Sequence, residues 1–204
     1  MRGGFLTFLL LGLSYIIGMI PNAFIYQKFV PISRLKYVRS DYIDALDMLK
    51  HIKEPPFFLT VGTDLLKGVA LALLGMFFSE SGTLALIMIL VAIFARNFNV
   101  FIGIRNGHGM AILFGGLMVY APIVIIPMVL FTMMIGFFSN ALDMALVLSV
   151  VLLPVSLAFL PDPLGAVIIS LMIMCVILTH QLMYAKEAAR RTRYKDSRYH
   201  NPYE

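Results

Sequence analysis

The chain has 204 residues, of which 60% are hydrophobic and 13% are charged, and its net charge is +5. A typical soluble domain is about half apolar and about a quarter charged, and a chain this short has too little interior to hide the surplus apolar surface from water. This composition excludes an ordinary soluble domain. The basic residues lie in short stretches beside apolar blocks, at 28–53, 96–105 and 186–198. That pattern is typical of cytoplasmic loops beside anionic head groups and disfavours nucleic-acid binding.

The apolar residues form long blocks, and most blocks match the roughly 20 residues that a helix needs to cross the hydrocarbon. The first block follows Met1-Arg2 and has no small-residue cleavage site of the usual form, so a retained first span is predicted. One later block, 109–137, is too long for one straight helix. Pro122 and Pro127 interrupt it, and proline removes a backbone donor. In chain order the blocks are 4–26, 57–78, 83–104, 109–137, 142–160 and 164–185.

The loop charges decide how often the block 109–137 crosses the membrane. If the basic stretch 28–53 is cytoplasmic, the tip 79–82 lies outside, and it carries no Lys or Arg, as expected. Two crossings that meet near Pro122 place the basic tail inside, whereas one crossing places it outside. The sequence therefore predicts an all-α integral membrane protein with about seven transmembrane helices.

The predicted protein is a single polytopic domain, residues 1–204, of the cell (inner) membrane. Its N-terminus is expected outside and its C-terminus in the cytoplasm. A polar cytoplasmic tail, 186–204, follows the last span, and the last helix is expected to continue through Arg193. No cofactor or metal is expected, because the single cysteine, Cys175, has no thiolate partner.

Charged residues in or beside spans are energetically costly. Each short cluster of polar residues in or beside the apolar blocks, here called a polar island, therefore needs a structural or functional role. In the first island, Asp41, Asp44 and Asp47 recur every third position and share one side of a helix. One interpretation is a solvated interfacial helix capped by Ser40 or Asp41. Metal binding by the three aspartates is the other, and no further carboxylate cluster supports it.

Two further islands flank the second and third spans. Asp64 and Lys67 lie one helical turn apart and can pair, either to support a site or only to neutralise and snorkel at the span's end. The next island combines glycines with basic residues, and its N–H groups can be aimed at an anion before a helix N-terminus. A tight interfacial turn is the alternative. This island comprises residues 96–99 (Arg-Asn-Phe-Asn) and 103–109 (Gly-Ile-Arg-Asn-Gly-His-Gly), which include Arg96, Gly103, Arg105, Gly107, His108 and Gly109.

The order of the islands resembles that of the bacterial PlsY-type acyl-phosphate:glycerol-3-phosphate acyltransferases over nearly the whole chain. The stretch Gly18-Met19-Ile20-Pro21 is similar to the family's Gly-Ser-Ile-Pro, and 64–68 matches its Asp-x-x-Lys-Gly. Residues 98–111 look like its glycine-rich second motif, and His180 falls where its third motif opens with His. The resemblance implies a seven-span bundle with a cytoplasmic active site.

The first motif departs from the family pattern Ser-Gly-Asn-x-Gly-Ala-Thr-Asn. Residues 40–47 read Ser-Asp-Tyr-Ile-Asp-Ala-Leu-Asp, so both glycines are replaced by aspartate. Elsewhere the family's Gly-His becomes Ala95-Arg96, its Gly-Gly-Lys becomes 106–108 (Asn-Gly-His), and its third-motif Asn falls on Met183. At a separation of about 4 Å, like charges repel by about 4 kcal/mol at an effective dielectric of about 20. Basic neighbours are needed to offset Asp41 and Asp44 if a phosphate binds there.

The resemblance implies a membrane acyltransferase of phospholipid synthesis that moves a fatty acyl group from acyl phosphate to the sn-1 hydroxyl of glycerol 3-phosphate. It implies no nucleic-acid partner. Ser40, His108 and His180 are the expected catalytic residues, with histidine as proton carrier. Asp64 and Lys67 are expected to support the site. A non-catalytic descendant that binds lipid or assists assembly, and a small transporter, are the alternatives. The expected phosphate-binding residues are Lys50, Arg96, Gly103, Arg105, Gly107 and Gly109.

Overall fold

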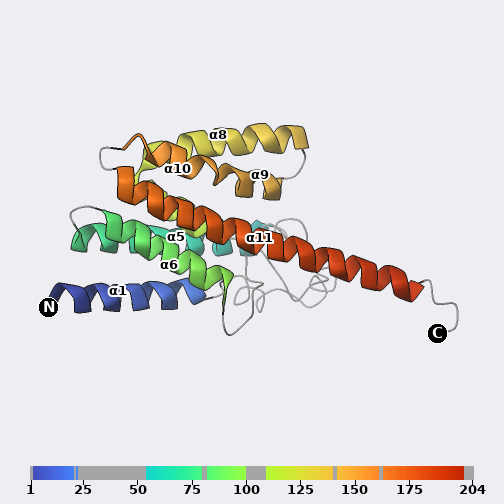
Figure 1. The fold of residues 1–204 in the computed structure, drawn as a ribbon, viewed down its shortest axis with the longest axis horizontal. Helices are drawn as coiled ribbons and strands as arrows, with labels where there is room; N and C mark the ends of the chain where they lie inside the picture. Colours follow the sequence, from blue (N-terminus) through green and yellow to red (C-terminus); the bar gives the residue numbers. More distant parts are fainter. Residues whose placement is uncertain are drawn as a thin grey trace.

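The computed structural model describes residues 2–20, 22, 54–79, 82–99, 109–139, 142–160 and 163–199. Every element within these ranges is an α-helix, and the helices run back and forth along one direction as a bundle (Figure 1). In chain order they are α1 (Arg2–Met19), α5 (Glu54–Phe78), α6 (Thr83–Asn97), α7 (Met110–Tyr120), α8 (Pro122–Ser139), α9 (Leu142–Ser149), α10 (Leu152–Leu157) and α11 (Pro163–Tyr199).

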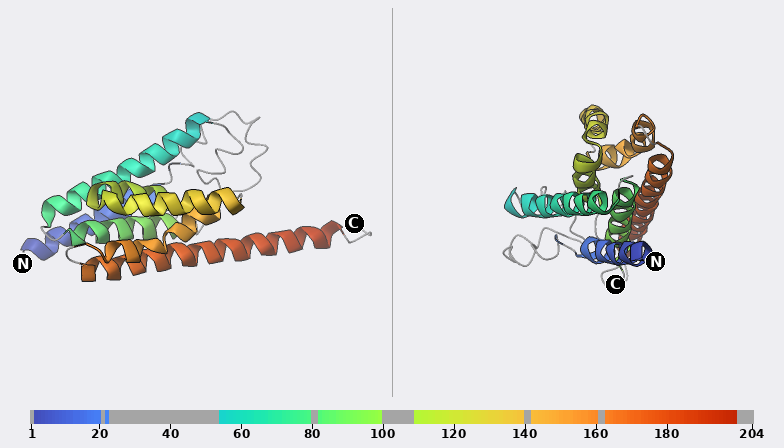
Figure 2. Two further views of the ribbon diagram at one scale, coloured as in Figure 1. Left: turned by 90° about the horizontal axis from the view of Figure 1, so that it is seen from above. Right: turned by 90° about the vertical axis from the view of Figure 1, so that its left-hand side faces the viewer.

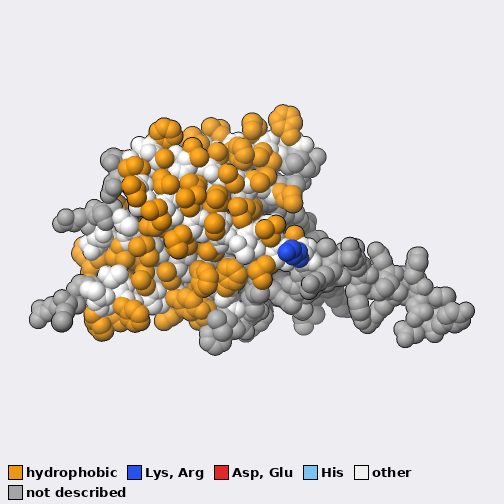
Figure 3. All heavy atoms as spheres, viewed as in Figure 1, with side chains coloured by type: hydrophobic (Ala, Val, Ile, Leu, Met, Phe, Trp, Pro, Cys, Tyr) orange, Lys and Arg blue, Asp and Glu red, His pale blue; other side chains and the backbone are white. Residues whose placement is uncertain are grey.

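The outer surface of the bundle is apolar. Phenylalanines of several elements are almost fully exposed, Phe159 after α10 at 87%, Phe77 of α5 at 82% and Phe137 of α8 at 82%, and hydrophobic side chains cover the face drawn in Figure 3. Water does not tolerate a continuous apolar surface of this extent, whereas lipid does. Two helical segments, Phe58–Phe78 and Pro163–Met183, are long and apolar enough to cross a membrane, and five further apolar helical segments are shorter.

The predicted break in the block 109–137 is confirmed. Helix α7 ends at Tyr120, Ala121 leaves helical geometry at φ −153° and ψ 75°, and α8 begins at Pro122. Proline suits this first helical position because its missing N–H has no intrahelical acceptor there. The expected interruption at Pro127 is not found, since α8 continues through it. The loss of one helical hydrogen bond is tolerated where the remainder of the helix is packed.

Several predicted helix ends differ from the structure. The block 142–160 is divided into α9 and α10, because Pro154 has no N–H for the Val150 carbonyl and the backbone changes there to i→i+3 bonds. Helix α6 ends at Asn97 rather than continuing to residue 104. Helix α11 continues to Tyr199, past Arg193, and runs well beyond the end of the bundle (Figure 2).

Helix α6 is central: it contacts α1, α5, α7 and α11, and most of its residues are buried. Helices α5 and α7 approach most closely where each has a glycine. A Cβ added at Gly115 would collide with the Leu65 carbonyl, and one added at Gly68 would collide with the Ile112 carbonyl. Small residues at such crossings let two backbones approach within van der Waals contact, which drives helix association in lipid.

Replacing Gly115 by Val is expected to lower stability by about 1–3 kcal/mol, because the new side chain meets backbone that can move only with its helix. Thermal unfolding in detergent micelles measures the effect. Gly12→Ala is the control, since nothing lies within 4 Å of a Cβ at that position. Equal melting temperatures for both variants would contradict the close crossing of α5 and α7.

Candidate active site

A buried carboxylate on α5 binds α6 and Asn22, a residue that follows α1, at one end of the bundle. Asp64 of α5 is 6% exposed. It forms one ion pair with Arg96 Nη2 at 2.9 Å and another with Lys67 Nζ at 3.3 Å. Asn22 Nδ2 donates to it at 2.7 Å. We refer to Asp64, Lys67 and Arg96 as the charged cluster.

The charged cluster also binds the end of α1. The Ile20 carbonyl accepts hydrogen bonds from Lys67 Nζ at 2.8 Å and from Arg96 Nη1 at 3.3 Å, and the Met19 carbonyl accepts one from Asn99 Nδ2 at 2.6 Å. The last carbonyls of a helix have no intrahelical donors and carry the negative end of its dipole. Cations and an amide therefore satisfy the end of α1 and hold it against α5 and α6.

The charge of the cluster is unbalanced. Among the described residues, two cations meet a single carboxylate, and the carbonyl dipoles at the end of α1 offset part of the remaining positive charge. Arg96 is 3% exposed, and its guanidinium is engaged by Asp64 and Ile20. Phosphate binding by Arg96 would require that guanidinium to leave Asp64.

His180 of α11 lies beside the same end of α6. It is 1% exposed, and its ring meets that of Phe98 edge-on, with 6.3 Å between centroids. Phe98 follows directly on Asn97, the last residue of α6. His180 of α11 therefore contacts the residue that follows α6, just as the Asp64–Arg96 pair joins α5 to α6.

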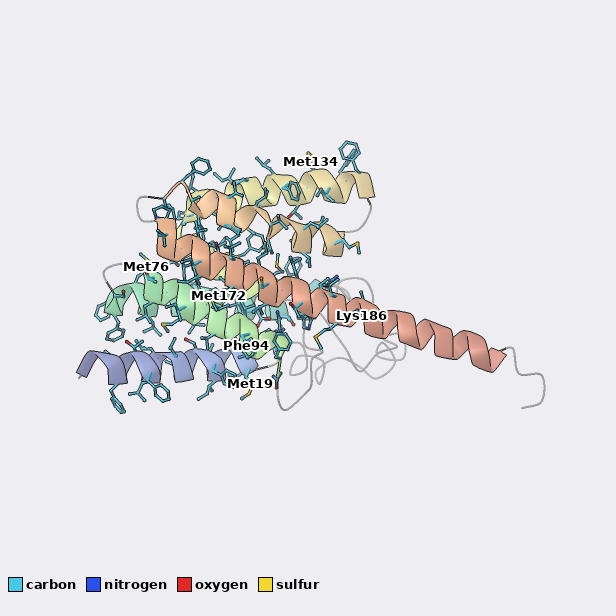
Figure 4. All side chains as sticks on the ribbon, viewed as in Figure 1. Met19, Met76, Phe94, Met134, Met172 and Lys186 are labelled. Atoms are coloured by element: carbon cyan, nitrogen blue, oxygen red, sulfur yellow. The ribbon has the colours of Figure 1, made fainter. Side chains whose placement is uncertain are left out.

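Gly109 starts α7 at this end as well. It is the N-cap residue of α7, its backbone is left-handed with φ 67°, and it has no side chain to cap the helix. In Figure 4, the labelled residues Met19 and Lys186 lie toward this end of the bundle, and Met76 lies toward the opposite end. Other expected site residues, namely Ser40, Lys50, Gly103, Arg105, Gly107 and His108, lie outside the described residues.

Sequence reasoning missed Asn22 as a member of this region, and it gave Asn97 and Asn99 no role of their own within the glycine-rich island. Asn22 directly follows the Gly-Met-Ile-Pro stretch inside an apolar block, and an amide in such a position needs a partner. That rule could have found it. The Ile20 and Met19 carbonyls had no sequence signal, because every residue has a carbonyl.

The site is thus the polar end of an all-α bundle with an apolar outer surface, the arrangement of an integral membrane protein with a site at the membrane boundary. The glycerol-3-phosphate acyltransferase family model matches residues 8–189, and the chain belongs to this family. The predicted family resemblance and the all-α membrane fold are confirmed.

Individual relatives agree with the family match. The chain is 25% identical over 155 residues to glycerol-3-phosphate acyltransferase 2 of Moorella thermoacetica, covering 76% of this chain and 79% of that protein. It is 31% identical over 111 residues to glycerol-3-phosphate acyltransferase 1 of Deinococcus radiodurans, covering 54% and 56%.

Two solved structures share the fold. The crystal structure of PlsY, an integral membrane glycerol 3-phosphate acyltransferase, in its glycerol 3-phosphate form superposes with a TM-score of 0.75 at 17% identity, covering 90% of this chain and 92% of that one. The lysophosphatidic acid form gives a TM-score of 0.71 at 16% identity, with the same coverage.

Replacing Asp64 by Leu is expected to destabilise the protein by about 3–5 kcal/mol, because it leaves the buried Arg96 and the partly buried Lys67 without a carboxylate. Adding Arg96→Met should recover part of that loss, since removing both partners of a buried pair costs less than removing one. A double-mutant cycle from unfolding in detergent measures the coupling. Strict additivity of the two losses would show that the pair does not interact.

Proposed function

We propose that the protein transfers a fatty acyl group from acyl phosphate to the sn-1 hydroxyl of glycerol 3-phosphate, forming lysophosphatidate and inorganic phosphate. The observation that carries the proposal is the family match over residues 8–189, whose region contains the charged cluster, Gly109 and His180. A non-catalytic lipid-binding role is not favoured, because the relatives matched are named as acyltransferases.

The reaction breaks the acyl carbon–oxygen bond to phosphate and forms an ester bond to the glycerol oxygen. The hydroxyl proton leaves with the phosphate. Acyl phosphate is already activated, so positioning the hydroxyl and stabilising negative oxygens can supply much of the rate enhancement. This chemistry needs two anion sites and a route for one proton.

We assign the anion sites to cations and to backbone N–H groups near α7. Gly109 begins α7 without a side-chain cap, which suits a bound anion. Lys50 and Arg105, with Gly103 and Gly107, would hold phosphate charge. The charged cluster would not contact the phosphate directly. It would supply a fixed positive charge at the end of α1.

Ser40 would position the substrate, and His180 or His108 would carry the proton. His180 is buried and contacts Phe98, the residue after α6, and this position supports its role as the imidazole that would serve the proposed anion site. A neutral imidazole is available near pH 7 and can accept and return a proton.

Purified protein in detergent or liposomes should convert acyl phosphate and glycerol 3-phosphate into lysophosphatidate, measured by mass spectrometry or with a labelled acceptor. Ser40→Ala should reduce kcat/KM by at least about a hundredfold, the lower range for loss of a catalytic group. Ser14→Ala is the matched control, because that hydroxyl only donates to the Leu10 carbonyl within α1. No product from folded wild-type protein would refute the proposed function.

The proposed function also implies an orientation of the bundle in the membrane. The phosphate substrates are cytoplasmic, so the polar end would face the cytoplasm of the inner membrane and the N-terminus of α1 would lie outside. The basic residues that follow Tyr184 agree with this orientation. A cysteine-labelling or reporter tag after Glu204 should be reached only from the cytoplasmic side. Access from the outer side alone would reverse the topology.

A further inference from the structure

The side-chain amide of Asn97 is buried and lacks a hydrogen-bond partner among the described residues. Asn97 is the last residue of α6, its exposed fraction is zero, and neither Oδ1 nor Nδ2 has a hydrogen-bond partner among the described residues. Asn99, two residues on, is equally buried but donates to the Met19 carbonyl. Buried amides are nearly always hydrogen-bonded, and an exception is often explained by a functional role.

The Asn97 side chain lies against the start of α7. A Cβ at Gly109 would come within 3.2 Å of Ile93 Cγ2 and 3.5 Å of Asn97 Oδ1. Ile93 and Asn97 are one turn apart on α6, so Gly109 rests on this face of the helix. A half-turn of the carboxamide exchanges its oxygen and nitrogen, and either atom can face the terminus of α7.

The start of α7 has donors of its own. Gly109 is its N-cap residue and has no side chain to cap the helix, and the first bond into the helix is from Leu113 N–H to the Gly109 carbonyl at 3.1 Å. The N–H groups of Met110, Ala111 and Ile112 precede that bond and have no acceptor within the helix. Gly109 offers them no side-chain acceptor, and the amide of Asn97 lies beside this residue.

We propose that Asn97 is a substrate-binding residue whose Nδ2 donates a hydrogen bond to an oxygen of a phosphoryl group held at the N-terminus of α7. A phosphoryl oxygen satisfies the buried amide and the first-turn N–H groups together, and its negative charge favours the helix N-terminus. This inference rests on the proposed function, since it takes the phosphoryl group to belong to acyl phosphate or to glycerol 3-phosphate.

The position of Asn97 within the site fits that role. The preceding residue, Arg96, belongs to the charged cluster, and the following residue, Phe98, contacts His180. Asn97 is therefore next in the chain to a residue of the charged cluster and to a residue that contacts the proposed proton carrier. The end of α6 would hold three successive side chains with different tasks: Arg96 anchors, Asn97 binds, and Phe98 contacts His180.

The test replaces Asn97 by Leu, which has nearly the same shape but cannot form a hydrogen bond, and by Asp, which adds a negative charge. Asn97→Leu should keep or raise the melting temperature of the ligand-free protein, because it removes a buried group without a partner. It should raise KM for one substrate about tenfold or more, as expected for loss of a hydrogen bond to a charged group. Asn97→Asp should raise that KM further by repulsion.

Varying acyl phosphate and glycerol 3-phosphate separately shows which phosphoryl group Asn97 binds. Glycerol 3-phosphate and inorganic phosphate should each be tested for raising the melting temperature of the wild type, and the stabilisation should be smaller in Asn97→Leu. Asn99→Leu is the structural comparison and should lower the melting temperature, because it breaks the bond to Met19. Ser170→Ala is the activity control, since that hydroxyl only donates to the Val167 carbonyl within α11.

A lower melting temperature for Asn97→Leu with both KM values unchanged would make Asn97 structural and overturn the inference. An active wild type whose KM values and ligand stabilisation match those of Asn97→Leu would also overturn it, while leaving the proposed function intact. A wild type that neither forms lysophosphatidate nor is stabilised by either phosphate compound would refute the proposed function itself.

Discussion

The arrangement of the polar end depends on the Asp64 carboxylate. It is buried, and it accepts from Arg96, Lys67 and Asn22, which come from three different segments of the chain. A buried ion is stable only when its partners are complete. The geometry of this one carboxylate therefore fixes the relative positions of α1, α5 and α6 at the end of the bundle where the family's motifs gather.

The two cations of the charged cluster do more than neutralise Asp64. Both also donate to the Ile20 carbonyl, so the negative end of α1 completes their coordination. The sequence Gly18-Met19-Ile20-Pro21 ends α1 in this position, and Gly18 lets α1 approach the backbone of α6 at Ala92. Close packing of α1 against α6 and the polar contacts at the end of α1 thus act on the same interface. The close packing positions the Ile20 carbonyl within hydrogen-bonding distance of the two cations.

This chain differs from the family pattern in how it distributes charge. It has Arg96 where the pattern has histidine, and it has His108 where the pattern has lysine. A permanent cation is thereby placed in the buried cluster, and a titratable side chain is placed in the glycine-rich stretch. Substrate phosphate would then meet a fixed positive support behind the site and depend more on neutral donors, N–H groups and amides, in front of it. The amide of Asn97 and the uncapped start of α7 are donors of that kind.

Much of the fold was predictable from the sequence, because the length of an apolar block and the loop charges are local quantities. They predicted helical spans and the break before Pro122. The helix ends were harder: α6 stops at Asn97 inside an apolar block, and α9 and α10 separate around Val150 because of a proline four residues further on. The prediction for Pro127 was wrong, since a proline inside a packed helix does not have to end it.

Of the candidate site, the sequence by itself determined the residue types and their order: an Asp and a Lys one turn apart, an Arg near the end of a span, a glycine before a helix and a histidine on the last one. Only the tertiary structure decided which of them meet. It paired Asp64 with Arg96, 32 residues along the chain, placed Phe98 against His180, and left the Asn97 amide buried without a described partner. Side-chain type is written in the chain, whereas burial and pairing across helices depend on how the helices pack, and no local pattern specifies that packing.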